Sequence, residues 1–264
     1  FLNAPGARVR VGVGGDGVAT LAVNAILTHA PHVSLGMVAA GAGNDTARSL
    51  DLDLKDPVAG VAHVIAALAR PRRRIDVGEI TVPARSDVSD TAGRRFFINV
   101  AGAGIDAAVN ARANHISWPR GSSRYVVALA IELASFRGFD VRVLADGVDV
   151  GDAGTLLAVA NSRYIGGGMK IAPNASWSDG YFDVVTARTV TRRTLARVFP
   201  KVYAGTHLTH PAVSVVRAKE VLLLPGDGSR PRLSRPPLVH ADGEPVGEMP
   251  LRLRVVPRGI GVLA

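Results

Sequence analysis

The stretch that decides the fold is VRVGVGGDGV at residues 9–18. Its valines alternate at positions 9, 11 and 13, which is typical of a strand, and three glycines with one aspartate follow at residues 14–17. Residues 18–30 then form an apolar segment of helical length. Strand, glycine turn and helix in this order predict one unit of a parallel α/β sheet.

The same order is repeated once. Residues 33–39 form a second strand-like run, residues 41–45 read Gly-Ala-Gly-Asn-Asp, and residues 46–50 and 57–69 have helical patterns. We therefore predict an α/β domain over residues 1–74. Two strands are few for such a sheet, so we expect the domain to lack its opening strand and the tail 255–264 to join it.

The pattern changes at residues 70–74, which we predict to be a solvated linker. Beyond it, short alternating strands separated by tight turns predict a mainly antiparallel β-sandwich domain over residues 75–254. The expected strands are residues 139–144, 148–150, 156–159, 181–186, 221–224, 237–240 and 251–256. The expected helices are residues 123–137 and 191–204, and residues 226–237 are expected to be a surface insertion.

Composition narrows the function classes. The 264 residues include no cysteine, which excludes disulfide scaffolds and thiolate metal sites and favours a cytoplasmic location. No apolar run approaches the ~20 residues that a membrane-spanning helix needs. The net charge is +9, and 27 of the 31 basic residues are arginine, so anionic partners are expected. With 5% aromatic residues and no helix-turn-helix or RNP signature, nucleic acid is not an expected partner.

The first glycine loop has the composition of a phosphate-binding loop. Glycines at the start of a helix let backbone N–H groups approach a phosphate, and the helix N-terminus adds partial positive charge. A carboxylate from Asp16 would repel phosphates unless a divalent cation lies between them, so this residue suggests Mg²⁺. The alternative is a tight turn in which Asp16 caps the helix.

The second loop, residues 41–45, also ends in an aspartate where a helix begins. Because parallel strands of one sheet bring such loops to the same edge, we expect the two loops to converge there. Two independent helix caps would be a weaker explanation of this arrangement.

The motifs resemble those of the diacylglycerol kinase catalytic domain family, which includes bacterial lipid kinases and sphingosine kinases. Gly-Gly-Asp-Gly at 14–17 and Gly-Asn-Asp at 43–45 resemble its first two motifs. Residues 99–107 resemble its N-x-x-G-x-G-x-D-A element, and residues 161–184 its N…GGG…P-x-A…DGxxDV block. Asp242-Gly243-Glu244 resembles its late D-G-E turn, so five motifs occur in order.

The resemblance implies an NAD-kinase-like nucleotide-binding domain, a β-sandwich lipid domain and a cleft between them. It implies transfer of the γ-phosphate of ATP to diacylglycerol or a similar lipid alcohol, giving phosphatidic acid, with Mg²⁺ as cofactor. Glu244 would be the general base, and Asp16 is also expected to be catalytic. The implied ATP-binding residues are Gly14, Gly15, Asp16, Gly17, Gly41, Gly43 and Asn44. The implied Mg²⁺ ligands, partly through water, are Asp16, Asp45 and Asp179.

Three positions depart from the family pattern. Val18 replaces the usual threonine after the first loop, Leu21 replaces a common glutamate, and Ala42 replaces a threonine in the second loop. The opening Asn-Pro…Gly phosphate loop has no convincing match. NAD kinase, which shares the Gly-Gly-Asp-Gly loop, and a catalytically weakened lipid- or nucleotide-binding relative are therefore retained as alternatives.

Several motif residues also have a simpler explanation. Asp242-Gly243-Glu244 could be a plain hairpin turn, and Asp179 could belong to another. The apolar stripe of residues 191–204 could pack on a sheet, or the basic helix could lie on the anionic inner face of the membrane. Peripheral membrane association is therefore expected, while the acceptor lipid and the oligomeric state, including a homodimer, stay open.

Overall fold

The computed structural model describes residues 8–54, 56–82, 93–104, 112, 116–118, 127–128, 131, 138–226 and 238–263. Its N-terminal unit begins with strand β1 (Val9–Gly14), helix α1 (Asp16–His29) and strand β2 (Ser34–Ala39). Helices α2 (Asp45–Ser49) and α3 (Pro57–Ala67) follow. β1 and β2 pair in parallel, as the strand–loop–helix pattern predicts.

The remaining strands form two antiparallel layers. One contains β3 (Arg73–Thr81), β4 (Arg95–Phe97), β6 (Val141–Ala145), β7 (Val148–Ala153), β13 (Glu220–Pro225) and the first part of β16 (Leu251–Leu263). The other has the order β12 (Val213–Ala218), β11 (Phe182–Ala187), β8 (Leu156–Ala160), β5 (Val100–Gly104), β14 (Val239–Ala241) and β15 (Glu244–Gly247).

Apolar side chains that alternate along these strands fill the space between the two layers. Phe97 and Phe182, from opposite layers, are fully buried and stack with their ring centroids 5.5 Å apart. Leu157 and Leu223 also belong to this core. Burial of large apolar side chains from both layers is the expected source of stability for a β-sandwich.

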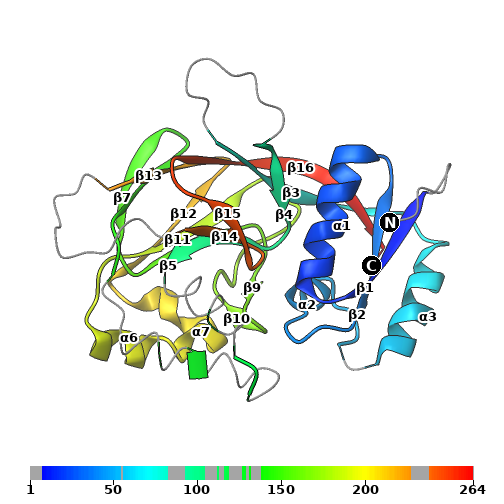
Figure 1. Ribbon diagram of the computed structural model, residues 1–264, viewed down its shortest axis with the longest axis horizontal. Coiled ribbons are helices and arrows are strands. Elements are labelled where there is room, and N and C mark those ends of the chain that lie inside the picture. The colour runs from blue at the N-terminus through cyan, green and yellow to red at the C-terminus, as the bar shows by residue number, and fades with distance from the viewer. Residues whose placement is uncertain are drawn as a thin grey trace.

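Strand β16 connects the two units, because it is thirteen residues long and changes partners along its length (Figure 1). Its first part pairs with β13 and β3, and its end runs parallel to β2, with Val262 opposite Leu35. The C-terminal strand therefore adds to the N-terminal sheet. The predicted limits at residues 74 and 254 fall inside β3 and β16, and the division into two domains stays a prediction.

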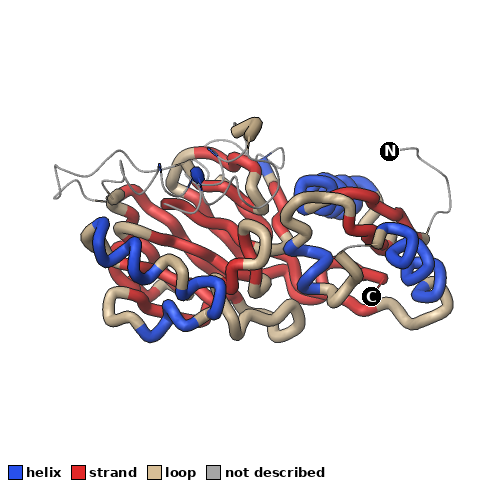
Figure 2. Tube along the Cα trace, turned by 90° about the horizontal axis from the view of Figure 1, so that it is seen from below, coloured by secondary structure: helices blue, strands red, loops and turns tan. Residues whose placement is uncertain are grey.

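Helices cover both faces of the short parallel sheet, whereas α6 (Arg192–Val198) and α7 (Lys201–Ala204) lie together on the outer face of the second sandwich layer (Figure 2). Two short strands, β9 (Tyr164–Ile165) and β10 (Met169–Lys170), and the 3₁₀ helix Thr206–Thr209 lie close to them. No helix in the described ranges is both long and apolar enough to cross a membrane.

Two local predictions were wrong. Residues 191–204 form two short helices instead of one, because Pro200 has no N–H to continue the hydrogen-bond ladder. Arg73 and Arg74 belong to β3 and not to a linker, although their side chains are exposed as expected. The predicted helix at 123–137 and insertion at 226–237 lie largely outside the described residues, as do positions 105–107 of the third motif.

Candidate functional site

The two glycine loops meet at the carboxyl ends of β1 and β2, as the parallel arrangement predicts. Their backbones are in contact, since a Cβ on Gly41 would lie 2.3 Å from the Cα of Gly15. A Cβ on Gly14 would lie 2.5 Å from the Val18 side chain. Glycine is therefore required at these positions because no space is left for a side chain.

Asn44 shapes the second loop. It adopts a left-handed conformation with φ 56°, and its side-chain amide closes the loop on Gly41. The Gly41 N–H donates to Asn44 Oδ1 at 2.9 Å, and Asn44 Nδ2 donates to the Gly41 carbonyl at 2.7 Å. The amide of this predicted ATP-binding residue thus holds the loop in shape, and Asn44 is itself buried.

Asp16 joins the two loops. It is the first residue of α1, but its carboxylate accepts hydrogen bonds from the first turn of α2, from Asp45 N at 3.1 Å and from Thr46 N at 2.8 Å. The alternative that Asp16 caps a helix is therefore partly correct, but the capped helix is α2 and not α1, the helix that Asp16 begins. Such a carboxylate stabilises the positive end of the neighbouring helix and fixes its distance from the glycine loop.

Asp45 lies directly beside Asp16 and is buried. Its Oδ2 accepts the Gly167 N–H at 2.8 Å, and its Oδ1 accepts a hydrogen bond from Arg48. Burial, followed by the charge of Asp16, raises the pKa of Asp45 to about 7, although Gly167 and Arg48 oppose the shift. Two adjacent carboxylates with one pKa near neutrality form a site that a cation would stabilise.

The third segment, Gly166–Gly168, comes from the sandwich and reaches the loops of the N-terminal unit. All three glycines have positive φ, between 62° and 110°, which side-chain-bearing residues rarely adopt. Gly167 donates to Asp45, and the Arg48 guanidinium lies against Gly168. The Gly-Gly-Gly motif therefore brings a loop of the sandwich into contact with the Asp45 carboxylate.

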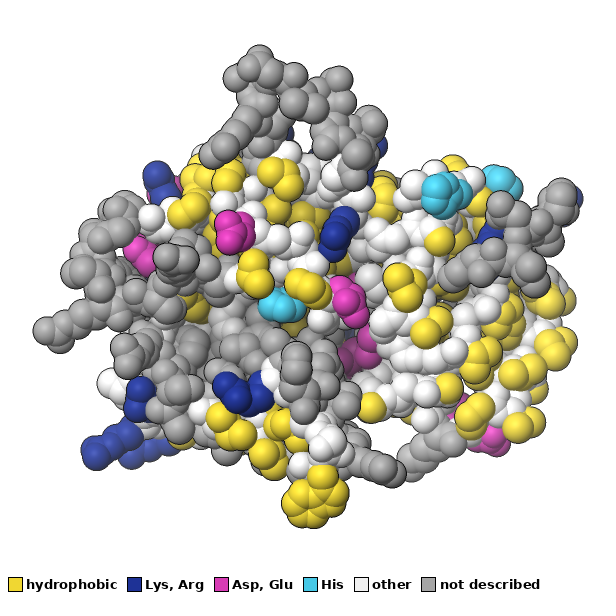
Figure 3. Space-filling view, in the orientation of Figure 1, with side chains coloured by type: hydrophobic (Ala, Val, Ile, Leu, Met, Phe, Trp, Pro, Cys, Tyr) yellow, Lys and Arg dark blue, Asp and Glu magenta, His cyan; other side chains and the backbone are white. Residues whose placement is uncertain are grey.

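Glu244 is the first residue of β15, and its side chain is exposed. Its Oε1 lies 4.0 Å from the position that a Cβ on Gly17 would occupy. The predicted base is thus opposite the predicted phosphate loop, although the two are 227 positions apart in the chain. Asp16, Asp45 and Glu244 are called the acidic cluster below. Acidic side chains are visible where the two units meet (Figure 3).

Asp242 holds the turn that carries Glu244, a role the motif did not reveal. Its carboxylate accepts hydrogen bonds from the backbone N–H groups of residues 98, 99 and 100 at 2.8 to 3.1 Å. It also accepts the Thr20 hydroxyl hydrogen at 3.0 Å, and Thr20 belongs to α1. The turn is therefore attached both to the sandwich and to the helix that follows the first glycine loop.

Asn99 is a second structural residue within a motif. Its Nδ2 donates to the Thr46 hydroxyl at 2.7 Å, and its Oδ1 accepts the Ser162 hydroxyl hydrogen at 3.0 Å. Asn161, which is fully buried, donates to the carbonyls of Asp76 and Ile98. These buried hydrogen bonds connect α2 with both segments of the sandwich and fix the cleft.

Asp179 is not brought to the other two predicted magnesium ligands, and this part of the prediction needs correction. Among the described residues, no group of three His, Asp or Glu side chains is arranged to hold a metal ion. The Asp179 carboxylate instead pairs with Arg217 and accepts the Tyr181 N–H at 3.1 Å. It lies in the turn before β11, whose register with β12 places it beside Arg217.

Comparison with known proteins agrees with this geometry. The family model described as "Diacylglycerol kinase catalytic domain" matches residues 4–80, and "YegS C-terminal NAD kinase beta sandwich-like domain" matches residues 99–264. The diacylglycerol kinase of Mycobacterium tuberculosis is 35% identical over 253 residues, which cover 95% of this chain and 74% of that protein. The chain belongs to the diacylglycerol kinase family. It is therefore a kinase, as the resemblance implied.

Other diacylglycerol kinase family relatives are more distant. The diacylglycerol kinase of Bacillus subtilis is 25% identical over 241 residues, covering 91% of this chain and 72% of that protein. A diacylglycerol kinase crystal structure from Bacillus anthracis str. Sterne is 17% identical, covers 97% of this chain and 76% of that one, and has a TM-score of 0.66. The structural likeness confirms the predicted fold class, an α/β domain followed by a β-sandwich.

Proposed function

We propose that this kinase transfers the γ-phosphate of ATP to the hydroxyl of diacylglycerol or a similar lipid alcohol, producing phosphatidic acid. One observation carries the proposal. Within five residues, the chain passes from Ile165, which lines an apolar pocket, to Gly167, which binds Asp45, and back to Met169 in the pocket. A polar site suited to phosphate and an apolar site suited to acyl chains are therefore adjacent, as a lipid kinase requires.

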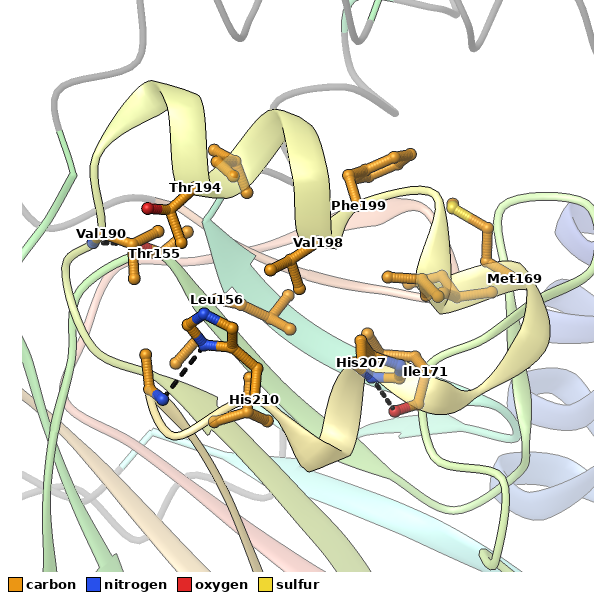
Figure 4. A pocket seen from close by; sticks show the side chains of 16 residues that line it. Thr155, Leu156, Met169, Ile171, Val190, Thr194, Val198, Phe199, His207 and His210 are labelled. Atoms are coloured by element: carbon orange, nitrogen blue, oxygen red, sulfur yellow. Dashed lines mark hydrogen bonds between the residues drawn. The ribbon is translucent and has the colours of Figure 1, made fainter.

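The apolar pocket, defined by Leu156, Ile165, Met169, Leu195, Val198 and Phe199, lies between α6, α7 and the sandwich (Figure 4). Its volume is about 60 Å³, and a single water needs only about 10–15 Å³ of such space. Thr155 on its wall donates to the Arg188 carbonyl and His207 Nε2 bonds to the Ile171 carbonyl, whereas His207 Nδ1 has no hydrogen-bond partner among the described residues. Such a wall favours an apolar ligand.

The apolar stripe predicted at residues 191–204 thus packs toward a sheet and also lines this pocket. Leu195 and Val202 are buried, while Arg193, Arg197 and Lys201 are exposed on other faces of the two helices. We propose that these cations face anionic lipid headgroups on the cytoplasmic side of the membrane, so that a lipid can reach the pocket. A homodimer stays a prediction.

ATP would bind at the converging loops. The N-terminus of α1 follows Gly15 directly, and helix starts carry backbone N–H groups that lack intrahelical partners. We propose that Gly14, Gly15, Gly17 and the second loop surround the phosphates. Val18 provides no hydroxyl here and instead packs against Gly14, so phosphate contacts would depend on backbone N–H groups.

The acidic cluster fits a magnesium ion. Asp16 and Asp45 are adjacent, and the raised pKa of Asp45 is partly caused by the charge of Asp16, which a cation would offset. In phosphoryl-transfer sites, Mg²⁺ is held by one or two carboxylates together with substrate phosphates. When bound, Mg²⁺ would neutralise charge on the β- and γ-phosphates. Asp16 and Asp45 would hold it partly through water, without Asp179.

Glu244 would act as the general base. Its exposed carboxylate opposite Gly17 can accept the proton of the lipid hydroxyl while that oxygen attacks the γ-phosphorus and ADP leaves. The hydrogen bonds of Asp242 keep the turn in place during this step. Phosphoryl transfer depends mainly on positioning and charge neutralisation, so these two carboxylates have separate tasks.

The test is transfer of labelled γ-phosphate from ATP, with Mg²⁺, to diacylglycerol, ceramide, sphingosine and NAD in parallel. The full-length protein is compared with Asp16→Ala and Glu244→Gln, and Glu248→Gln, an exposed glutamate after the same hairpin, is the matched control. Label on one lipid, lost in both variants and kept in the control, is the expected result. Label on NAD alone would assign NAD kinase activity instead, and no transfer with no ATP binding would leave a lipid-binding relative.

A further inference from the structure

A second, polar pocket lies at the other end of α2 from the acidic cluster. It is bounded by the last turn of α2, the first residue of β3 and the loop that precedes β9. Its volume is about 110 Å³, whereas one water needs about 10–15 Å³ of such space, so it admits an ion of several heavy atoms. Neither the phosphate-transfer site nor the apolar pocket includes this space.

Three arginines line the pocket: Arg48, Arg73 and Arg163. Asp51 is the one acidic side chain among its lining residues, and Arg48 is paired with Asp45 outside the pocket, so the arginines exceed the carboxylates by one. Arginine forks bind carboxylates and phosphates in preference to water, so a pocket with this charge favours a compact dianion.

The guanidinium groups are available to different extents. Arg48 is occupied, since it donates to the Gly43 carbonyl and to Asp45. Arg163 uses its Nε to donate to the Ala175 carbonyl at 3.3 Å, and its side chain has no other hydrogen bond among the residues that the structure describes. Within the described part of the chain, the Arg73 guanidinium has no hydrogen-bond or ion-pair partner, although its residue lies on an ordered strand.

A buried hydroxyl adds a neutral donor. Ser49 lines the pocket, and its Oγ is inaccessible to solvent and has no hydrogen-bond partner. Leaving a buried hydroxyl unsatisfied is unfavourable, so a rotation that turns the Ser49 Oγ into the pocket would let a bound anion accept its hydrogen. An anion with several oxygens could accept from Ser49 and from the two arginine forks together.

We propose that this pocket is a binding site for a phosphate-class dianion, either inorganic phosphate or the headgroup of a phosphomonoester, separate from the site of phosphate transfer. The proposal does not depend on the acceptor lipid or on the catalytic role of Glu244. Arg48 contacts both sites, so occupancy of the pocket and the conformation of the second glycine loop are linked through one side chain.

Calorimetry on the full-length protein tests the proposal with three probes: inorganic phosphate, glycerol 3-phosphate, and phosphatidic acid in phosphatidylcholine vesicles. A non-hydrolysable ATP analogue is present at saturation so that the transfer site is filled. We expect saturable binding of at least one probe, and the probe bound best identifies free phosphate, a soluble ester or a lipid headgroup as the ligand.

Arg73→Gln and Arg163→Gln should each weaken that binding about tenfold, because each removes a charge-assisted contact. Arg73→Lys, which keeps the charge without the fork, should give an intermediate loss. Arg252→Gln, on the exposed side of β16, should bind as the parent does, and thermal unfolding checks that every variant is folded. Absence of binding to all three probes, or equal binding by both glutamine variants, would overturn the proposal.

Discussion

The acidic cluster and the apolar pocket lie on either side of residues 165–169, yet they are built in opposite ways. The acidic side is held by directional hydrogen bonds that backbone N–H groups donate to the carboxylates of Asp16, Asp45 and Asp242. The apolar side is formed by side chains that pack without directional bonds. Hydrogen bonds fix atoms in place, whereas apolar contacts tolerate changes of shape. Substitutions in the acidic cluster should therefore stop phosphate transfer, whereas substitutions in the apolar pocket should change the affinity for the lipid.

The largest effect is expected from Glu244→Gln. Loss of the general base should lower kcat about 10²–10⁴-fold, while ATP affinity and the thermal midpoint stay at the parent values because the side chain is exposed. Steady-state kinetics with ATP and lipid varied separately measure this split. A variant that turns over at the parent rate would show that a different group accepts the proton.

The pH dependence of stability tests the acidic side without turnover. The pKa of Asp45 is about 7 in the folded protein and 3.8 in the unfolded reference, so protonation stabilises the fold below about pH 4 and this contribution is lost as pH rises to 7. Without Mg²⁺ and nucleotide, the free energy of unfolding should fall by up to about 4 kcal/mol over that range. Urea titrations of the parent and Asp45→Asn at both pH values measure it. A parallel fall in the variant would contradict the assignment to Asp45.

Asp242→Ala should destabilise the fold by about 3 kcal/mol, because three backbone N–H groups and the Thr20 hydroxyl lose their acceptor. Activity should fall as well, since the turn no longer holds Glu244 opposite Gly17. Chemical denaturation gives the first quantity and the lipid kinase assay the second. Unchanged stability with lost activity would instead place Asp242 in the reaction itself.

The apolar side should respond in a graded way. Val198→Phe partly fills the pocket and should exclude about two methylenes of the acyl chain, each worth ~0.8 kcal/mol on burial. The value of kcat/KM for long-chain diacylglycerol should therefore fall about tenfold. Short-chain diacylglycerol and ATP should show parent kinetics. Val215→Phe, on a partly exposed position of β12, is the matched control. Equal losses for short and long chains would argue against an acyl-chain site here.

The smallest effect is expected from Asp179→Asn. The carboxylate is paired with a half-exposed Arg217, and such pairs contribute about 0–1 kcal/mol. Stability and the Mg²⁺ dependence of activity should therefore remain near the parent values in thermal unfolding and kinetic titrations. A large rise in the Mg²⁺ requirement would return Asp179 to the magnesium site.

Much of the N-terminal unit was predictable because its signals are local. The helix predicted at 18–30 is α1 at Asp16–His29, and the strand predicted at 33–39 is β2 at Ser34–Ala39. In the sandwich, β3, β5 and β12 were missed. β3 is nearly continuously buried although it contains the charged residues Asp76 and Glu79, and β5 consists of one valine with alanines and glycines, which have weak strand propensity. β12 was missed although its first five residues are partly or fully exposed.

The sequence predicted which residues belong to the candidate site better than it predicted what each residue does there. The motif residues Asp16, Asp45 and Glu244 were named from the sequence, and the structure places Asp16 beside Asp45 and Glu244 opposite Gly17. The structural roles of Asp242 and Asn99 were not predicted from the sequence, because each side chain forms a hydrogen bond with a residue more than fifty positions away. Asp179 was also named from its motif, but the motif does not reveal the pairing of its carboxylate with Arg217.

By itself, the sequence determined the order of strands, glycine loops and helices in the N-terminal unit, the family and the residues that carry its motifs. These follow from backbone preferences and side-chain patterns that act within a few residues. Only the tertiary structure decided that Asp16 caps α2, that one strand, β16, pairs with the sandwich strands β13 and β3 before its tail joins β2, and that an apolar pocket adjoins the segment that binds Asp45. Those contacts depend on strand order and register between distant segments, which no local pattern specifies.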